Sequence, residues 1–184
     1  VIFDTPKKTH RHVEYTDYKA NRDAMPEGIS TAIPYIKKIL HSFNIPALSV
    51  DGFEADDVIG TLAKQAAEQG FQTYMMTPDK DFAQLVADSV FIYKPGSRGN
   101  SSEVWDANKV CEKFDVNNVS QVIDFLGMVG DSVDNIPGIV GVGPKTSSKL
   151  LKKYNSMEQI YNSINELDGK LKEKLDAAGV SNNF

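Results

Sequence analysis

The sequence predicts an α/β protein in which a parallel sheet is followed by a small all-helical region. Short apolar runs alternate with amphipathic segments as far as residue 118, which is typical of strands and helices that alternate along a parallel sheet. Beyond that residue only helical patterns follow. We therefore expect one domain over residues 1–118 and a second domain over residues 119–184.

Strands are expected where short apolar runs end at turn residues, over 1–3, 47–50, 71–76, 90–94 and 103–105. The helices of the first domain are expected over 29–43, 54–69, 82–86 and 106–113. Pro34 should kink the first of these helices or start its second part, and Asp106 is suited to be the N-cap of the last. Residues 5–25 are polar and basic and indicate an extended or partly helical surface segment.

The second domain should consist of four short helices, over 119–129, 144–154, 156–163 and 168–178. Pro144 fits the first turn of a helix, where its missing N–H is not needed.

The composition is that of an ordinary globular protein, with 41% hydrophobic and 24% charged residues. No apolar run approaches the ~20 residues of a membrane span, and no secretory signal is present. The single cysteine, Cys111, fits a reducing, cytoplasmic location. A net charge of −5 argues mildly against nucleic-acid binding. The basic residues are nevertheless clustered, as Lys7, Lys8, Arg11, Lys19 and Arg22 near the start and as Lys145, Lys149, Lys152 and Lys153 in one later helix.

Acidic residues gather where the first three expected strands end or the next helix begins. They are Asp4, Glu54, Asp56, Asp57, Asp79 and Asp81. The carboxyl ends of parallel strands meet at one edge of a sheet, and carboxylates gathered there repel one another unless a cation lies between them. Hard divalent ions prefer oxygen ligands and can drive phosphoryl chemistry. The pattern therefore predicts a metal-dependent enzyme that acts on phosphates.

Each acidic cluster also has a simpler explanation when it is taken alone. Acids in the first turn of a helix are favoured by the helix dipole, and an Asp-x-Asp sequence after a strand can be a solvated turn. A further pair, Asp131 and Asp134, could be a polar loop that caps the next element. This pair joins the site only if the helical region folds back over the sheet edge.

A glycine-rich segment at residues 137–146 suggests a phosphate contact. A nucleotide-binding P-loop needs a lysine directly after its last glycine and a strand before it. Here Pro144 intervenes and an Asp/Asn-rich loop precedes, so we exclude ATP or GTP binding by this segment. A tight hairpin that leads into a basic helix would instead bind the backbone of DNA; the alternative is a plain packing corner. The expected DNA contacts are Arg11, Gly141, Gly143, Lys145, Thr146 and Lys149.

Six motifs occur in the order and spacing of a known family: VIFD (1–4), YKANR (18–22), GFEADD (52–57), TPDKD (77–81), GDSVDN (130–135) and PGIVGVG (137–143). Over nearly its whole length the chain resembles the 5′–3′ exonuclease domain of bacterial DNA polymerase I, within the flap endonuclease superfamily. The resemblance implies a PIN-like nuclease core followed by a helix–hairpin–helix-type DNA-binding region. It also implies a cytoplasmic, nucleoid-associated bacterial protein whose full-length chain carries a polymerase domain.

The resemblance further implies phosphodiester hydrolysis with two Mg²⁺ or Mn²⁺ ions, on nicked duplexes, 5′ flaps and RNA primers, and a K⁺ ion at the hairpin. Lys19 and Arg22 resemble the cationic pair that contacts the scissile phosphate, although spacing alone would favour a solvated basic helix face. The inner metal ligands would be Asp4, Glu54, Asp56 and Asp57. The remaining acidic ligands would be Asp79, Asp81, Asp131 and Asp134.

The sequence departs from the family pattern at its start, because the family's core begins with an earlier strand that carries another metal-binding Asp. We therefore expect a fragment that lacks the first strand, which could leave it less stable, self-associating, weak in metal binding or inactive. Two other functions stay open. One is a non-catalytic, structure-selective DNA-binding module, against which the intact acids argue. The other is a metal-dependent phosphatase with Asp79 as nucleophile, but Phe82-Ala83 replaces the Thr or Val expected there.

Overall fold

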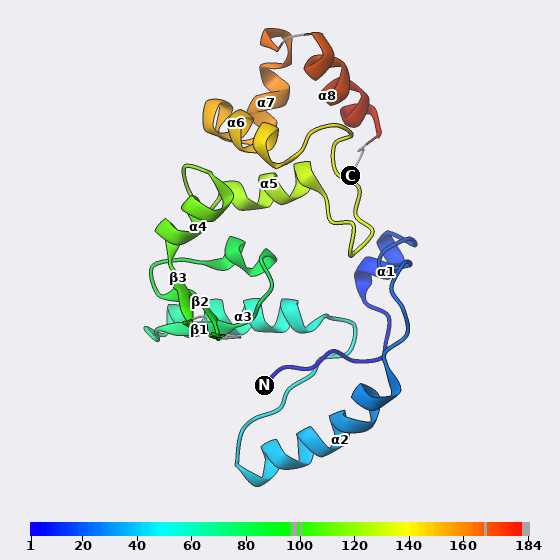
Figure 1. Ribbon diagram of the computed structural model, residues 1–184, viewed down its shortest axis with the longest axis vertical. Helices are drawn as coiled ribbons and strands as arrows, with labels where there is room; N and C mark the ends of the chain where they lie inside the picture. The colour runs from blue at the N-terminus through cyan, green and yellow to red at the C-terminus, as the bar shows by residue number, and fades with distance from the viewer. Residues whose placement is uncertain (97–98, 100, 168, 182–184) are drawn as a thin grey trace. The chain divides into compact units, whose positions relative to one another are not determined.

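The computed structural model describes residues 1–96, 99, 101–167 and 169–181. The chain forms two compact units, whose elements can be followed by colour in Figure 1. Unit 1 comprises Val1–Leu62 and Val133–Asn135, and unit 2 comprises Ala63–Ser132 and Ile136–Phe184. The chain passes from unit 1 to unit 2 within helix α3 (Ala55–Glu68).

Unit 1 contains helices α1 (His10–Glu14) and α2 (Glu27–Ser42) and the start of α3. The strands expected over 1–3 and 47–50 are wrong in extent, because the two segments meet in a single parallel bridge between Ile2 and Leu48. Within the described residues neither segment has a second neighbouring strand that would extend the pairing. The bridge still places the residues that follow Ile2 beside the chain that leads into α3.

Helix α2 runs through Pro34 without a break, so of the two expected outcomes the start of a second helical part is wrong. A proline inside a helix removes one backbone hydrogen bond, but the remaining bonds of this 16-residue helix continue on both sides of it. The apolar residues of α2 are largely exposed, among them Ile29, Tyr35 and Ile39.

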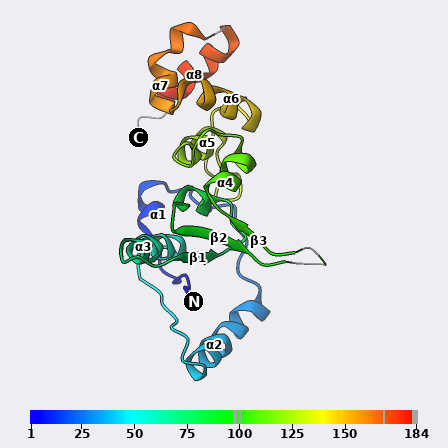
Figure 2. The same ribbon diagram turned by 90° about the vertical axis from the view of Figure 1, so that its left-hand side faces the viewer.

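The sheet of unit 2 contains β1 (Thr73–Met76), β2 (Val90–Lys94) and β3 (Glu103–Trp105), side by side in that order (Figure 2). Strands β1 and β2 are parallel, as expected, whereas β2 and β3 are antiparallel. The sheet is therefore mixed, with the expected parallel pairing between β1 and β2. A parallel crossover needs roughly a dozen or more residues, and the connection from β2 to β3 is too short to provide one.

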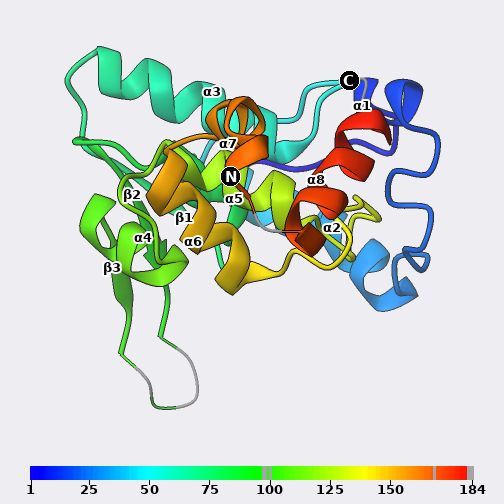
Figure 3. The same cartoon turned by 90° about the horizontal axis from the view of Figure 1, so that it is seen from above.

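The helices of unit 2 follow the predicted order, and no strand occurs after β3 among the described residues (Figure 3). They are η1 (Asp81–Leu85), α4 (Ala107–Phe114), α5 (Gln121–Val129), α6 (Pro144–Tyr154), α7 (Met157–Asn162), η2 (Ile164–Glu166) and α8 (Gly169–Ser181). Asp106 caps α4 by accepting a hydrogen bond from the Lys109 N–H, and Pro144 opens α6; both predictions are confirmed. Among the described helices, none is both long and apolar enough to span a membrane.

A buried amide joins two helices of unit 2. The Gln121 side chain on α5 is only 1% exposed. Its Nε2 donates to the carbonyl oxygens of Leu151 and Asn155, each at 2.9 Å, and its Oε1 accepts from the Asn117 N–H at 2.8 Å. One side chain therefore satisfies backbone groups at the end of α6 and before α5, as buried polar groups require.

Replacing Gln121 with leucine should destabilise the protein, because the backbone groups that the amide now satisfies would lose this partner inside the protein. We expect a loss of about 2–4 kcal/mol in the free energy of unfolding, measured by denaturant unfolding. Gln159→Leu, at an exposed position on α7, is the matched control and should change stability by less than about 0.5 kcal/mol. Equal unfolding midpoints for the two variants would contradict this role of Gln121.

Candidate metal and phosphate site

The start of helix α3 gathers carboxylates in unit 1. Glu54 directly precedes the helix, and the Ala55 N–H donates to Asp4 Oδ1 at 2.7 Å. The Glu54 N–H donates to Asp57 Oδ2 at 3.0 Å. Free N–H groups at a helix start attract acceptors and negative charge, so the helix itself favours part of this acidic cluster.

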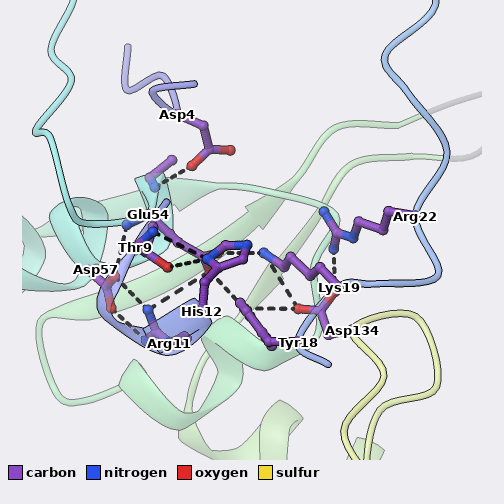
Figure 4. Close-up of polar contacts among 11 residues, drawn as sticks. Asp4, Thr9, Arg11, His12, Tyr18, Lys19, Arg22, Glu54, Asp57 and Asp134 are labelled. Carbon is purple, nitrogen blue, oxygen red and sulfur yellow. Dashed lines mark hydrogen bonds and ion pairs between the residues drawn. The ribbon is translucent and has the colours of Figure 1, made fainter. Parts of the chain in front are cut away.

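Glu54 lies at the centre of the cluster and is only 8% exposed (Figure 4). The Tyr18 hydroxyl donates to its Oε2 at 2.9 Å, and Lys19 Nζ donates to its Oε1 at 2.8 Å. Burial alone would raise the pKa of Glu54, but the hydrogen bonds from Lys19 and Tyr18 outweigh it, and the pKa lies below its ordinary value. Burial and the bond to Glu54 raise the pKa of Tyr18, so this phenol stays protonated.

Asp134 belongs to the same unit, although it comes from a distant part of the sequence. Its carboxylate pairs with Arg22, and its Oδ2 lies 3.6 Å from Lys19 Nζ. Its backbone oxygen accepts from the Lys19 N–H at 3.0 Å, and Asn135 Nδ2 donates to the Asp17 carbonyl at 2.7 Å. Segment 133–135 is therefore held by both side chains and backbone beside residues 17–22.

Lys19 and Arg22 do not lie on a helix, because residues 16–21 form consecutive turns. The alternative of a solvated basic helix face is therefore wrong. Lys19 has a φ of 56°, a conformation that costs a non-glycine residue roughly 1 kcal/mol or more. This turn directs its ammonium between the carboxylates of Glu54 and Asp134. The carboxylate oxygens of Glu54 and Asp134 thus surround one cation, and oxygen atoms are the ligands that a hard divalent ion prefers.

Arg11 and Asp57 form a separate, bidentate pair. Arg11 Nη1 donates to Asp57 Oδ2 and Nη2 donates to Oδ1, both at 2.7 Å. The bond from Arg11 holds the pKa of Asp57 below its usual range, and the pKa of Arg11 is raised in turn. Arg11, predicted to contact DNA, and Asp57, predicted to bind metal, bind each other in this structure.

The predicted acids divide between the two units. Asp4, Glu54, Asp56, Asp57 and Asp134 belong to unit 1. Unit 2 holds Asp79, Asp81 and Asp131. Asp79 Oδ1 accepts from the Asp81 N–H at 3.0 Å in the turn after β1. Within the described residues, no three side chains of His, Cys, Asp or Glu are placed so that they could hold one metal ion.

The glycine segment of unit 2 forms a tight turn before α6. Gly130 and Gly138 bring two stretches of backbone into close contact, since a Cβ on Gly130 would lie 2.2 Å from the Gly138 nitrogen. Gly143 precedes α6, where its carbonyl accepts from the N–H groups of Thr146 and Ser147. The side chains of Lys145 and Lys149 are exposed on α6.

Two contacts of unit 2 were not anticipated from the sequence. Lys152, part of the basic cluster in the sequence, pairs from the last turn of α6 with Asp115. Lys174 Nζ on α8 donates to the Gly141 carbonyl at 2.9 Å. The Tyr18 hydroxyl was likewise missed as a polar contact of the acidic cluster, because only its place in the YKANR motif marks it. No periodicity or charge pattern in the sequence signals any of the three.

Comparison with known proteins supports this architecture. A family model described as "5'-3' exonuclease, N-terminal resolvase-like domain" matches residues 1–115, and one described as "5'-3' exonuclease, C-terminal SAM fold" matches residues 117–182. The sequence is 45% identical over 160 residues to a 5′–3′ exonuclease of Aquifex aeolicus, covering 87% of this chain and 54% of that protein. It is 41% identical over 177 residues to DNA polymerase I of Bacillus subtilis, covering 96% of this chain and 20% of that protein.

Solved structures share the fold. The T5 D15 protein co-crystallised with metal ions matches with a TM-score of 0.79 at 23% identity, over 97% of this chain and 70% of that chain. The catalytic core of Rad2 in complex with a DNA substrate matches with a TM-score of 0.60 at 20% identity, over 100% and 58%. The expected nuclease core followed by a helical region is confirmed as the fold class. The chain spans about half of the exonuclease and about a fifth of the polymerase that it matches.

Removing the Tyr18 hydroxyl should weaken the acidic cluster while the ring keeps its packing. We expect Tyr18→Phe to lower the free energy of unfolding at pH 7 by about 1–2 kcal/mol, and Tyr35→Phe, at an exposed position on α2, to have no measurable effect. Because the bond lowers the pKa of Glu54, its contribution is present above the unfolded-state pKa of about 4.3. It is lost as the pH falls through the lower pKa of the folded state. Denaturant unfolding at pH 7 and pH 3 should show the wild-type advantage shrinking; an equal difference at both pH values would contradict this role.

Proposed function

The chain belongs to the 5′–3′ exonuclease family, and we propose on that basis that it is the nuclease part of a longer DNA-processing protein. The proposed reaction is metal-dependent hydrolysis of phosphodiester bonds, both as a 5′–3′ exonuclease and as a 5′-flap endonuclease. Relatives named DNA polymerase I support a polymerase domain in the same full-length chain. Nicked duplexes, 5′ flaps and RNA primers paired to DNA are the proposed substrates.

One observation carries the proposal more than any other: Lys19 contacts the carboxylate of Glu54 at the start of α3, and Arg22 contacts the carboxylate of Asp134, which Lys19 also approaches. A nuclease needs oxygen ligands for cations and a positive charge for the phosphate in the same place, and unit 1 brings the two together. The residues proposed to hold Mg²⁺ or Mn²⁺ are Asp4, Glu54, Asp56, Asp57, Asp79, Asp81, Asp131 and Asp134. When bound, such ions supply an activated water and stabilise the leaving oxygen.

Side chains of the protein would stabilise the scissile phosphate and orient the acidic cluster. Lys19 and Arg22 would offset the negative charge that develops on the scissile phosphate. Both are cations on long side chains, so they can exchange a carboxylate partner for a phosphate oxygen. The Tyr18 hydroxyl would hold Glu54 in one orientation through its bond to Oε2, and an ionised carboxylate keeps further lone pairs for other partners. Hydrolysis in this direction would leave a 5′-phosphate on the product.

Unit 2 would bind the DNA backbone. Exposed Lys145 and Lys149 on α6 and the N–H groups near Gly141 and Gly143 offer positive charge and donors to phosphates, with Thr146 in the first turn beside them. Such contacts position a duplex without reading its sequence. A K⁺ ion at the glycine turn would strengthen them.

Cleavage of a 5′-flap DNA with Mg²⁺ by the intact protein tests the reaction. Asp56→Asn should reduce cleavage by at least about 100-fold, because a metal-binding group contributes several kcal/mol to the transition state, and it should leave DNA affinity within about threefold. Asp88→Asn, at an exposed position of unit 2, is the matched control. DNA binding without cleavage by the wild type would favour a non-catalytic DNA-binding module. Release of phosphate from a small monoester would favour a phosphatase.

The backbone-binding role of α6 has its own test. Replacing both Lys145 and Lys149 with alanine should weaken binding to all duplex sequences alike and reduce the slope of log affinity against log salt by about two. Fluorescence anisotropy at salt concentrations between roughly 50 and 200 mM measures both the DNA affinity and its salt slope. The matched control is Lys64→Ala, which removes one exposed lysine of α3. An unchanged slope in the double variant would refute the contact.

A further inference from the structure

The acids at the start of α3 are not equivalent, and Asp57 is the most heavily engaged of those whose contacts are described. Its Oδ1 accepts from Arg11 Nη2, and its Oδ2 accepts from both Arg11 Nη1 and the Glu54 N–H. Three of the roughly four lone-pair sites of an ionised carboxylate are therefore used. Every one of these bonds lies within unit 1.

The bond to the Glu54 N–H has a structural reason. Asp57 is the third residue of the helix, and a side-chain acceptor at this position commonly reaches back to the N–H of the residue before the helix, as in a capping box. The Asp57 carboxylate thus satisfies one of the free donors of the helix start and fixes the backbone that carries Glu54.

The partners of Asp57 and Glu54 also differ in kind. Glu54 receives a lysine ammonium, which is a compact point charge on a flexible stem. Asp57 receives a planar guanidinium whose two N–H groups match its two oxygens. A bidentate pair of this geometry loses two charge-assisted bonds at once when it opens, so Asp57 is poorly suited to release its partner and bind a metal ion.

Arg11 connects Asp57 to the segment that carries Tyr18 and Lys19. It lies on helix α1, whose His10 N–H donates to the Gly52 carbonyl at 3.4 Å. The ring of the next residue, His12, packs edge-on against Tyr18, with 5.2 Å between ring centroids. The backbone then continues from Tyr18 into Lys19, so the position of α1 sets where the hydroxyl and the ammonium meet Glu54.

From these contacts we propose that Arg11 and Asp57 are a positioning pair, in place of the DNA contact and the metal ligand that the sequence suggested. The pair fixes α1 against the start of α3 and thereby places Tyr18 and Lys19 beside Glu54. This inference rests on the proposed nuclease function, because it removes Asp57 from the ligand set of that site.

Metal binding separates a ligand from a positioning residue. Mn²⁺ titration of the intact protein by calorimetry, without DNA, should show that Asp56→Asn weakens binding at least tenfold. Asp57→Asn and Arg11→Met should each leave the Mn²⁺ dissociation constant within about threefold of the wild type. Equal weakening by Asp57→Asn and Asp56→Asn would overturn the proposal.

A thermal double-mutant cycle tests the pair itself. Arg11→Met and Asp57→Asn should each lower Tm by about 3–8 °C, and the double variant should lose clearly less than their sum, since either change already breaks the pair. Additive Tm shifts would overturn the proposal, whatever the Mn²⁺ titration shows.

Kinetics distinguish positioning from stability alone. At a temperature well below the Tm of every variant, Arg11→Met should lower kcat on a 5′-flap substrate about 10- to 100-fold and leave KM within about threefold. A purely stabilising pair would leave kcat unchanged under these conditions, and that result would refute the positioning role. A wild-type protein that neither binds Mn²⁺ nor cleaves DNA would instead refute the nuclease function, and the thermal cycle would still decide whether the pair exists.

Discussion

Mutual repulsion among the carboxylates at the start of α3 is the constraint on which the rest of unit 1 depends. Several negative charges gathered in a partly buried place are costly unless each meets a donor or a cation. The chain offsets this cost with backbone N–H groups of the helix start, with the Tyr18 hydroxyl, and with the cations of Arg11 and Lys19, while Arg22 pairs with Asp134. Helix α1 and the turns that follow it carry the side chains that act as these partners.

The same cluster gives a reason for the strained turn at Lys19. A φ of 56° is unfavourable for lysine, yet it allows the backbone N–H to reach the Asp134 carbonyl while the ammonium reaches the carboxylate of Glu54. Two polar contacts in unit 1 thus stabilise one unfavourable backbone conformation. Local strain of this kind is most common where side chains must be held for a task.

Local signals in the sequence predicted the helices of both units within a few residues, but not the extent of the strands in unit 1. The cap at Asp106 and the helix start at Pro144 were found because short-range chemistry fixes them. The extent of strands 1–3 and 47–50 was overestimated because strand length depends on neighbours that a local pattern does not contain. The residue types of the site were also visible in the sequence. Their pairing was not, since a bidentate bond between Arg11 and Asp57 joins positions that no spacing rule relates.

Asp134 reaches its partners from a three-residue segment whose neighbours on both sides belong to the other unit. The connectivity therefore makes the two units topologically inseparable: no single cut in the chain yields each of them as an independent polypeptide. A piece that ends near residue 118 would keep Arg22 and Lys19 but lose the carboxylate that binds both. Separating the two units would require relocating segment 133–135 within the sequence, because neither truncation nor circular permutation makes the segments of each unit contiguous.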